Sequence, residues 1–206
     1  MNKATLFFVA MITMALSVNA QDCKYTDLST TYDYEIHNVL RRSNYVVHSA
    51  PLEVRVLDKK TGKTVQRISF LSGVLFLDKY ENCGVVRSFI TGKNKDAAAP
   101  GNDHGNLIIA DLNFDGKEDI AIKYDSSNTG GPIYNFYTQQ ADGTFKKDTY
   151  LSNSVMYFPV AINNKNKTLR INVPIGIHKH TETTYQYNNQ TNSLKIVNHK
   201  LVANKI

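Results

Sequence analysis

The sequence predicts an all-β protein, either β-propeller-like or a sandwich of short antiparallel strands, with a calcium-binding loop between two of the strands. Three observations support this prediction. Apolar residues alternate with polar ones over short stretches, turns rich in Gly and Asn separate these stretches at near-even spacing, and helix signals are scarce. The sequence has no strict repeat, so a propeller is suggested by the short strands and their near-even spacing and not by a measured period.

Short strands are expected from residue 52 to near the C-terminus. In the first of them, Leu52, Val54 and Val56 alternate with charged residues, which is the period of a half-buried strand. A Lys-Lys-Thr-Gly turn then leads into a returning strand, and the same pattern continues along the chain. The expected strands, in chain order, span 52–56, 64–70, 74–77, 85–90, 107–110, 120–124, 133–137, 168–173, 183–187 and 194–197.

The segment before these strands has weaker signals. Residues 21–50 are mostly polar, with one mildly helical patch at 34–40, and we interpret them as an N-terminal arm or a first strand. Residues 51–206 are then expected to form a single β domain, because their length fits one domain and 42% hydrophobic residues are enough for a core.

The most specific motif is the nine-residue range 111–119. Oxygen-bearing side chains stand at its positions 1, 3, 5 and 9, and Gly116 stands at position 6, as in a calcium-binding loop. Alternate side chains of a tightly curled loop point inward, and Ca²⁺ prefers several hard oxygen ligands. The sequence therefore predicts a calcium site formed by Asp111, Asn113, Asp115, the backbone carbonyl of Lys117, and Asp119.

This loop differs from that of an EF-hand. Its twelfth position, where an EF-hand has a bidentate Glu, is Ile122, and the flanking ranges 107–110 and 120–124 have the β-branched content of strands. The expected unit is therefore a strand, a calcium loop and a second strand. A plain acidic hairpin turn is the alternative, because Asp, Asn and Gly also favour turns.

The first twenty residues have the features of a secretory signal peptide. Lys3 supplies a positive charge, residues 4–16 form an apolar stretch, and Val18-Asn19-Ala20 resembles a cleavage site. The apolar stretch is shorter than the about 20 residues of a membrane span, and no later stretch is long enough. We therefore expect an exported protein, periplasmic or secreted, with no transmembrane segment after signal cleavage.

Both cysteines, Cys23 and Cys83, lie after the expected cleavage site. An even number of cysteines in an oxidising compartment predicts one disulfide between them. In the chain-entropy account, a bridge that closes so long a loop stabilises the fold by about 4 kcal/mol. Two unpaired thiols are the alternative.

Charge and motifs argue against several classes of function. Without Lys3, the net charge is 23 − 18 = +5, but the basic residues are scattered along the chain, so nucleic-acid binding is not expected. The sequence contains no nucleophile elbow, no phosphate-binding glycine loop and no zinc signature. We therefore expect no catalytic residues and no enzymatic activity.

The tyrosines suggest a binding surface. The chain has 12 Tyr, 9 Phe and no Trp, and several of the Tyr stand in turn-rich stretches. Aromatic residues beside an ordered loop are suitable contacts for a protein or glycan partner. We predict that the calcium loop and the turn at 128–132 form one rim, and that Asp125, Asn128 and Tyr150 contact the partner.

The range 108–145 resembles a known family. It contains Ile-Ala-Asp-Leu-Asn-Phe-Asp-Gly-Lys-Glu-Asp-Ile, then Gly130-Gly131, Tyr134-Asn-Phe-Tyr137 and Asp142-Gly143-Thr-Phe145. These motifs resemble those of bacterial exported proteins with an FG-GAP-like calcium loop, whose best-known relatives are periplasmic immunity proteins that inhibit lysozyme-like toxins delivered by type IV secretion. The resemblance implies a β-propeller-like fold and calcium bound at 111–119. It carries over no inhibitory residue.

Two functions are consistent with these features. The first is an exported calcium-binding β protein that binds another macromolecule, as an immunity-type inhibitor of a peptidoglycan hydrolase such as a lysozyme. The alternative is an adhesion or glycan-binding module of the cell envelope. A neighbouring gene that encodes a lysozyme-like toxin would favour the first.

Overall fold

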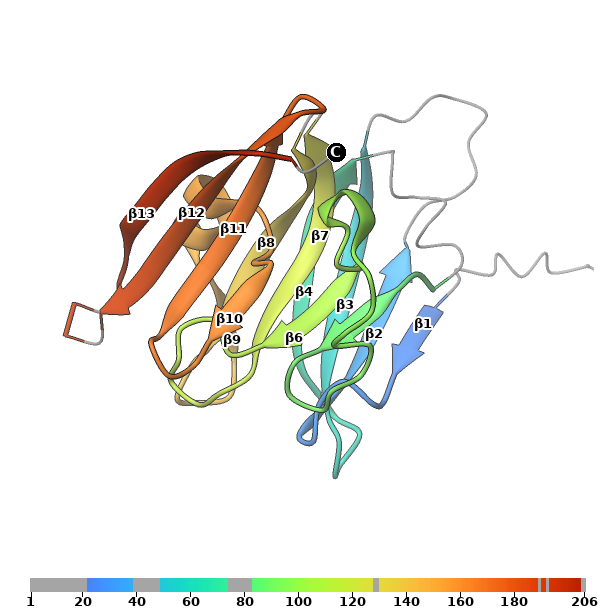
Figure 1. Ribbon diagram of the computed structural model, residues 1–206. Helices are drawn as coiled ribbons and strands as arrows, with labels where there is room; N and C mark the ends of the chain where they lie inside the picture. Colours follow the sequence, from blue (N-terminus) through green and yellow to red (C-terminus); the bar gives the residue numbers. More distant parts are fainter. Residues whose placement is uncertain are drawn as a thin grey trace, which may run out of the picture.

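The described residues form three β-sheets, none of them closed (Figure 1). The computed structural model describes residues 22–38, 49–73, 83–127, 130–188, 190–191 and 193–204. Strands dominate these ranges, and the short elements η2 (Pro100–Asn102, 3-10) and η3 (Leu151–Val155, π) are helical. The prediction of an all-β protein is confirmed. The signal peptide expected at 1–20 lies outside the described residues.

The strands follow chain order through the three sheets, and neighbours are antiparallel except for the parallel pair β5 and β6. The first sheet consists of β1 (Asp22–Tyr25), β2 (Tyr32–Asn38), β3 (Ser49–Asp58) and β4 (Thr64–Gly73). The middle sheet consists of β5 (Val86–Ser88), β6 (Leu107–Ala110), β7 (Asp119–Ser127), β8 (Gly131–Gln139) and β9 (Phe145–Lys147). The third sheet consists of β10 (Ala161–Asn163), β11 (Thr168–Ile175), β12 (Lys179–Asn188) and β13 (Ser193–Ala203).

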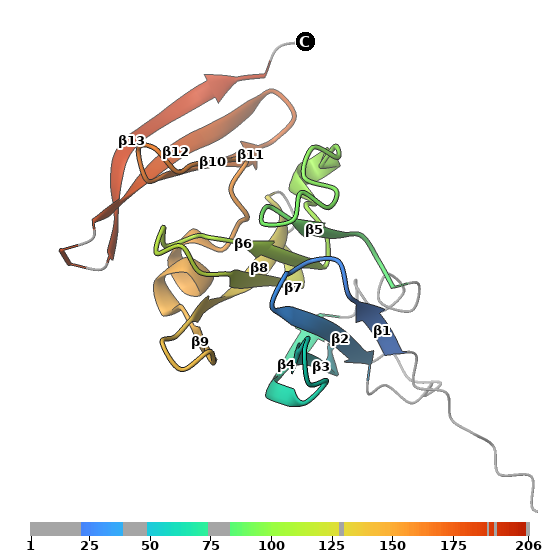
Figure 2. The ribbon, with the colours of Figure 1, turned by 90° about the horizontal axis from the view of Figure 1, so that it is seen from below.

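The middle sheet lies between the other two sheets and is buried on both faces (Figures 1 and 2). Successive side chains of a strand point to opposite faces. Leu107 and Ile109 of β6 accordingly pack with the first sheet, whereas Ile108 and Ala110 pack with the third. All four residues are buried, which explains why this strand reads as an uninterrupted apolar run without polar alternation.

Of the two interpretations of the N-terminal segment, an arm or a first strand, the structure favours a strand, because the described residues of the mildly helical patch at 34–40 belong to β2. Tyr34 and Ile36 are buried while Glu35 between them is partly exposed, which is the period of a strand. β2 pairs with β1 on one side and with β3 on the other. The segment is therefore part of the first sheet and not a detached arm. The strand expected at 85–90 is shorter, and the one at 74–77 lies outside the described residues.

The predicted disulfide between Cys23 and Cys83 is confirmed, with Cα atoms 5.2 Å apart. Cys23 is buried in the core between the first and middle sheets. The Tyr25 hydroxyl donates a hydrogen bond of 2.9 Å to the Cys83 carbonyl at the same place. The bridge thus joins strand β1 to the segment that leads into β5.

Candidate metal loop and adjoining groove

The predicted calcium loop connects two buried strands of the middle sheet. Ala110 at the end of β6 pairs with Asp119 at the start of β7, so residues 111–118 form a loop closed at its base. Gly116 has a φ of +84°, a conformation that L side chains rarely adopt. This explains why position 6 of the motif is glycine. We call residues 111–119 the metal loop.

Backbone amides of the metal loop bring three of the predicted ligands together. The amide of Asp115 donates to Asp111 Oδ1 and to Asn113 Oδ1, both at 3.1 Å. The Gly116 amide donates to Asp111 Oδ2 at 3.0 Å, and the Lys117 amide donates to Asp115 Oδ1 at 2.8 Å. Because the oxygens of Asp111 and Asn113 share one amide, they converge over the same part of the loop.

Asp119 has a different place in the structure. It is fully buried, and its carboxylate accepts hydrogen bonds from the amides of Leu112 at 2.9 Å, Asn113 at 3.3 Å and Gln139 at 3.0 Å. Burial raises the pKa of Asp119 to about 7, and the nearby carboxylates of Asp115 and Asp111 add to the rise. Asp119 therefore fastens the metal loop to strand β8.

The remaining oxygens fit a hard cation. Burial raises the pKa of Asp111, and the negative charge of Asp115 raises it further. A bound cation would relieve this repulsion between the two carboxylates. In the described ranges, no three His, Cys, Asp or Glu side chains are arranged as a metal site. A cation here would therefore depend on the Asn113 amide oxygen, the Lys117 carbonyl and water besides the carboxylates of Asp111 and Asp115, a donor set typical of calcium.

A groove of about 660 Å³ adjoins the metal loop and continues between the ends of the middle and third sheets. We call it the loop groove. Its lining includes Asn113, Asp115 and Lys117 of the metal loop. The rest of its lining comes from other elements and includes Gln139, Gln140, Lys146, Lys147, Tyr150 and Tyr187. The structure thus joins the predicted metal residues to Tyr150, one of the three predicted partner residues.

Tyr150 is 40% exposed, and its ring meets that of Tyr185 edge-on with centroids 6.4 Å apart. It stands just before η3, which packs against β8. Sequence reasoning missed Lys146, Lys147 and Tyr187, because contacts between strands far apart in the chain bring them to the groove. The Asp-Gly-Thr-Phe motif before β9 marked a turn there but not a site.

The predicted single rim is wrong. The metal loop precedes Asp119, whereas the turn at 128–132 follows Ser127, and these residues are the two ends of β7. At about 3.3 Å per residue, the strand separates them by roughly 25 Å. Asp125 lies near the second end, where its carboxylate accepts a 2.8 Å hydrogen bond from the Ser126 amide. Asn128 lies outside the described residues.

The carboxylate of Asp125 also lies against the backbone of Gly73 in β4, so that a Cβ at Gly73 would collide with it. Asp125 is therefore at the junction of the first and middle sheets, away from the loop groove. In the described part of the chain, no helix is long and apolar enough to cross a membrane.

No protein-family model and no curated protein matches this chain. Among solved structures, it is similar to a Xanthomonas protein described as related to a type IV secretion system. The TM-score is 0.55 at 15% sequence identity, and the match covers 89% of this chain and 88% of that chain. At this identity the likeness concerns the backbone and not the site residues. The chain therefore shares its overall fold with a type IV secretion system related protein of Xanthomonas.

Proposed function

We propose that this protein is exported and binds a lysozyme-like peptidoglycan hydrolase through the loop groove, as an immunity-type inhibitor. The fold shared with a type IV secretion system related protein along nearly the whole chain is the observation that carries this proposal. The disulfide between Cys23 and Cys83 agrees with an oxidising compartment outside the cytoplasm. The three stacked sheets would correspond to blades of an open propeller.

The metal loop is proposed to bind calcium through Asp111, Asn113, Asp115 and the carbonyl of Lys117. When bound, the ion would supply a positive charge that holds these oxygens together. Asp119 would support the loop through the hydrogen bonds that its carboxylate accepts from the backbone amides of Leu112 and Gln139. A loop fixed in one conformation loses less conformational entropy on association, so calcium is expected to tighten partner binding.

The lining of the loop groove suits a protein surface. Tyr150 and Tyr187 offer aromatic contact area, and Lys117, Lys146 and Lys147 add three positive charges against the carboxylates of Asp115 and Asp148. Tyr residues often dominate binding energy at interfaces, and charge complementarity speeds association. An acidic loop of the hydrolase is the expected counterpart.

The alternative function, a glycan-binding module of the cell envelope, is favoured by one observation. Gln139 and Gln140 line the loop groove together with the two tyrosines, although the Gln139 amide also hydrogen-bonds the Tyr32 hydroxyl and the Glu118 amide. Aromatic faces and amides provide both apolar contact and hydrogen bonds in ligand sites. A glycan partner would be bound by the groove without any hydrolase.

An inhibition titration tests the proposal. The oxidised mature chain is added to a lysozyme-like hydrolase encoded near its own gene, and to an unrelated lysozyme, with calcium or with chelator. We expect inhibition of the first enzyme only, weakened at least tenfold by Tyr150→Ala. Soluble peptidoglycan fragments are titrated in parallel. Binding of the fragments without inhibition of any hydrolase would favour the glycan-binding alternative.

A further inference from the structure

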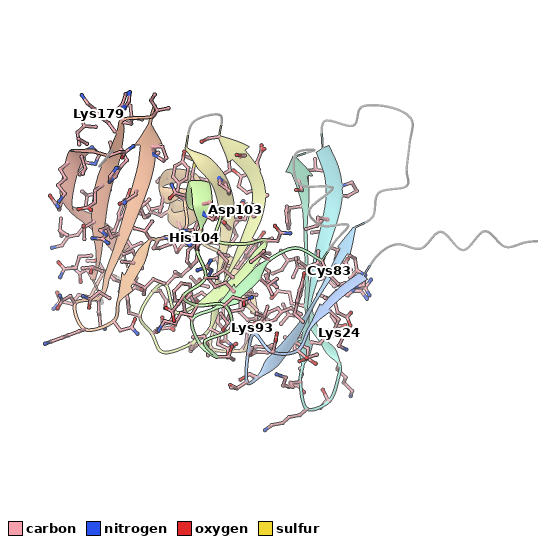
Figure 3. The ribbon with its side chains drawn as sticks, turned by 45° about the vertical axis from the view of Figure 1, so that its right-hand side comes forward. Lys24, Cys83, Lys93, Asp103, His104 and Lys179 are labelled. Atoms are coloured by element: carbon pink, nitrogen blue, oxygen red, sulfur yellow. A yellow bond between two sulfur atoms is a disulfide. The ribbon has the colours of Figure 1, made fainter. Side chains whose placement is uncertain are left out.

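A second pocket lies away from the loop groove and has no part in the function proposed above. It has a volume of about 380 Å³ and is formed by the end of β5, the long segment between β5 and β6, and residues 159–160. Its lining includes Arg87, Lys95, Asp96, Asn102, His104 and Val160, and we call it the Arg87 pocket. Figure 3 shows His104 and its neighbour Asp103 beside the middle sheet.

Arg87 is a buried cation with an unused donor group. The residue is 3% exposed. Its Nε donates to the His104 carbonyl at 3.0 Å, and its Nη1 donates to the carbonyls of Lys95 at 3.0 Å and Ala97 at 2.9 Å. The third nitrogen, Nη2, is buried and has no hydrogen-bond partner among the described residues. A buried donor without a partner costs about 1–3 kcal/mol, more when it is charged.

His104 is the second buried group with unused polar atoms. It is 7% exposed, and its ring packs against Phe158 with centroids 5.1 Å apart. Its backbone is held by the Tyr134 hydroxyl and by Arg87, but within the described ranges neither ring nitrogen has a partner. Burial and the charge of Arg87 lower the pKa of His104 to about 4, so at neutral pH the ring is uncharged and carries one N–H donor.

The charges around the pocket leave positive charge in excess. Lys123, also almost fully buried, pairs with Asp103 at 2.8 Å. In the described part of the chain, Arg87 has no ion pair of its own, although Asp103 and Asp96 attract it from further away. Lys95 adds an exposed ammonium and Asp96 a carboxylate to the pocket lining, so the buried guanidinium of Arg87 remains as the net positive charge. A buried charge normally has a partner, so an incoming anion would complete this arrangement.

We propose that the Arg87 pocket binds an oxyanion, a carboxylate or a phosphate group, through Arg87 Nη2 and a ring nitrogen of His104, with Lys95 as an outer contact. Guanidinium groups match the geometry of both anions, and hydrogen bonds from a charged donor are about twice as strong as neutral ones. The hydrogen bonds from Nε and Nη1 to backbone carbonyls hold the guanidinium in place, so that Arg87 loses little side-chain entropy when an anion binds.

The test is an NMR titration of the oxidised protein with sodium phosphate and, separately, with sodium acetate, at ionic strength kept constant with sodium chloride. We expect a saturable shift of the Arg87 Nε and His104 ring resonances with at least one of the two. The apparent pKa of His104 should rise when the anion is bound. Saturation by phosphate identifies a phosphate group as the preferred ligand, and saturation by acetate identifies a carboxylate.

Two variants test the proposed contacts, and a third is the control. His104→Phe keeps the ring but removes its nitrogens, and Lys95→Gln removes an exposed charge, so each should weaken binding, His104→Phe by about tenfold. Lys93→Gln is the matched control, because Lys93 is exposed on the same segment, pairs with Asp27 at 2.8 Å and does not line the pocket. Its affinity should stay within twofold of the parent. Linear shifts with both anions, or equal losses for Lys93→Gln and Lys95→Gln, would overturn the proposal.

Discussion

Asp115 is the predicted metal ligand best suited to substitution. Its side chain is 32% exposed, and its carboxylate accepts one hydrogen bond from the Lys117 amide. Calcium that binds the folded loop and not the unfolded chain raises stability by mass action. We expect calcium in excess over chelator to raise the melting temperature by several degrees, and Asp115→Ala to abolish this rise. Differential scanning calorimetry measures both.

Lys117→Ala serves as the control for that experiment. The side chain of Lys117 is 42% exposed and pairs with the Asp115 carboxylate at 3.7 Å, and only the backbone carbonyl of Lys117 is proposed to face the ion. The calcium-dependent rise in melting temperature should therefore persist in this variant. Identical melting curves with calcium and with chelator for the parent protein would refute a calcium site.

His104 makes stability depend on pH. Its pKa falls from an ordinary 6.5 to about 4 on folding, mainly through burial. Between these two pKa values His104 is protonated in the unfolded chain but neutral in the folded chain. The free energy of unfolding therefore decreases as pH falls from about 6.5 to 4. The loss amounts to about 3 kcal/mol, with no contribution from His104 above this window. Urea unfolding at pH 7 and pH 4.5 measures the difference.

The matched variant for this measurement is His104→Phe, which keeps a ring against Phe158. The raised carboxyl pKa values of Asp111 and Asp119 act in the opposite direction, because they favour the folded state at low pH. The parent and the variant share this contribution, so the contrast between them isolates His104. An equal pH dependence in both proteins would be inconsistent with a buried neutral imidazole.

At the scale of strands, alternation and turns predicted much of the fold. Leu52, Val54 and Val56 alternate as expected and are buried in β3. The segment at 34–40 could not be assigned locally, because the pairing of β2 with both neighbours decides its conformation. The metal loop could be proposed from the sequence because its candidate ligands lie within nine consecutive residues, and calcium binding there stays a prediction. The loop groove and the Arg87 pocket depend on contacts between distant strands, so no local pattern predicts them.

Strand β6 allows its two faces to be tested separately. Ile109 packs with the first sheet and Ile108 with the third, and both are fully buried. Replacing either with Ala should cost about 2–5 kcal/mol of unfolding free energy. Ile109→Ala is expected to lower both the melting temperature and partner binding, whereas Tyr150→Ala should weaken binding alone. Calorimetry with a binding assay checks this, and a Tyr150→Ala protein that melts as early as Ile109→Ala would contradict it.

The disulfide is a link between elements. Peptide mapping by mass spectrometry without reduction should recover Cys23 and Cys83 in one linked pair. Loss of a bridge that spans 60 residues should lower the free energy of unfolding by about 4 kcal/mol in the chain-entropy account. The double variant Cys23→Ala/Cys83→Ala, compared with the oxidised parent in urea, measures this value. Two freely alkylated thiols in protein recovered from its native compartment would refute the bridge.

For the whole molecule, we expect binding without turnover. Immobilised oxidised protein should retain its partner in calcium and release part of it in chelator, since the metal loop borders the loop groove. Mass spectrometry of the eluate identifies the partner, and Tyr150→Ala provides a folded control that should retain less. Hydrolysis of peptidoglycan by the purified protein alone, lost in a point variant that still folds, would instead make it an enzyme.

The covalent connection also constrains how the molecule matures. Strands β2, β3 and β4 all lie between Cys23 and Cys83, so the closed bridge makes most of the first sheet a covalent ring. During synthesis Cys23 leaves the ribosome sixty residues before Cys83. The sequence contains no third cysteine that could form a disulfide with either of them. Oxidation within one chain therefore has a single product and needs no reshuffling. A thiol-trapping time course would show only an open form and a closed form.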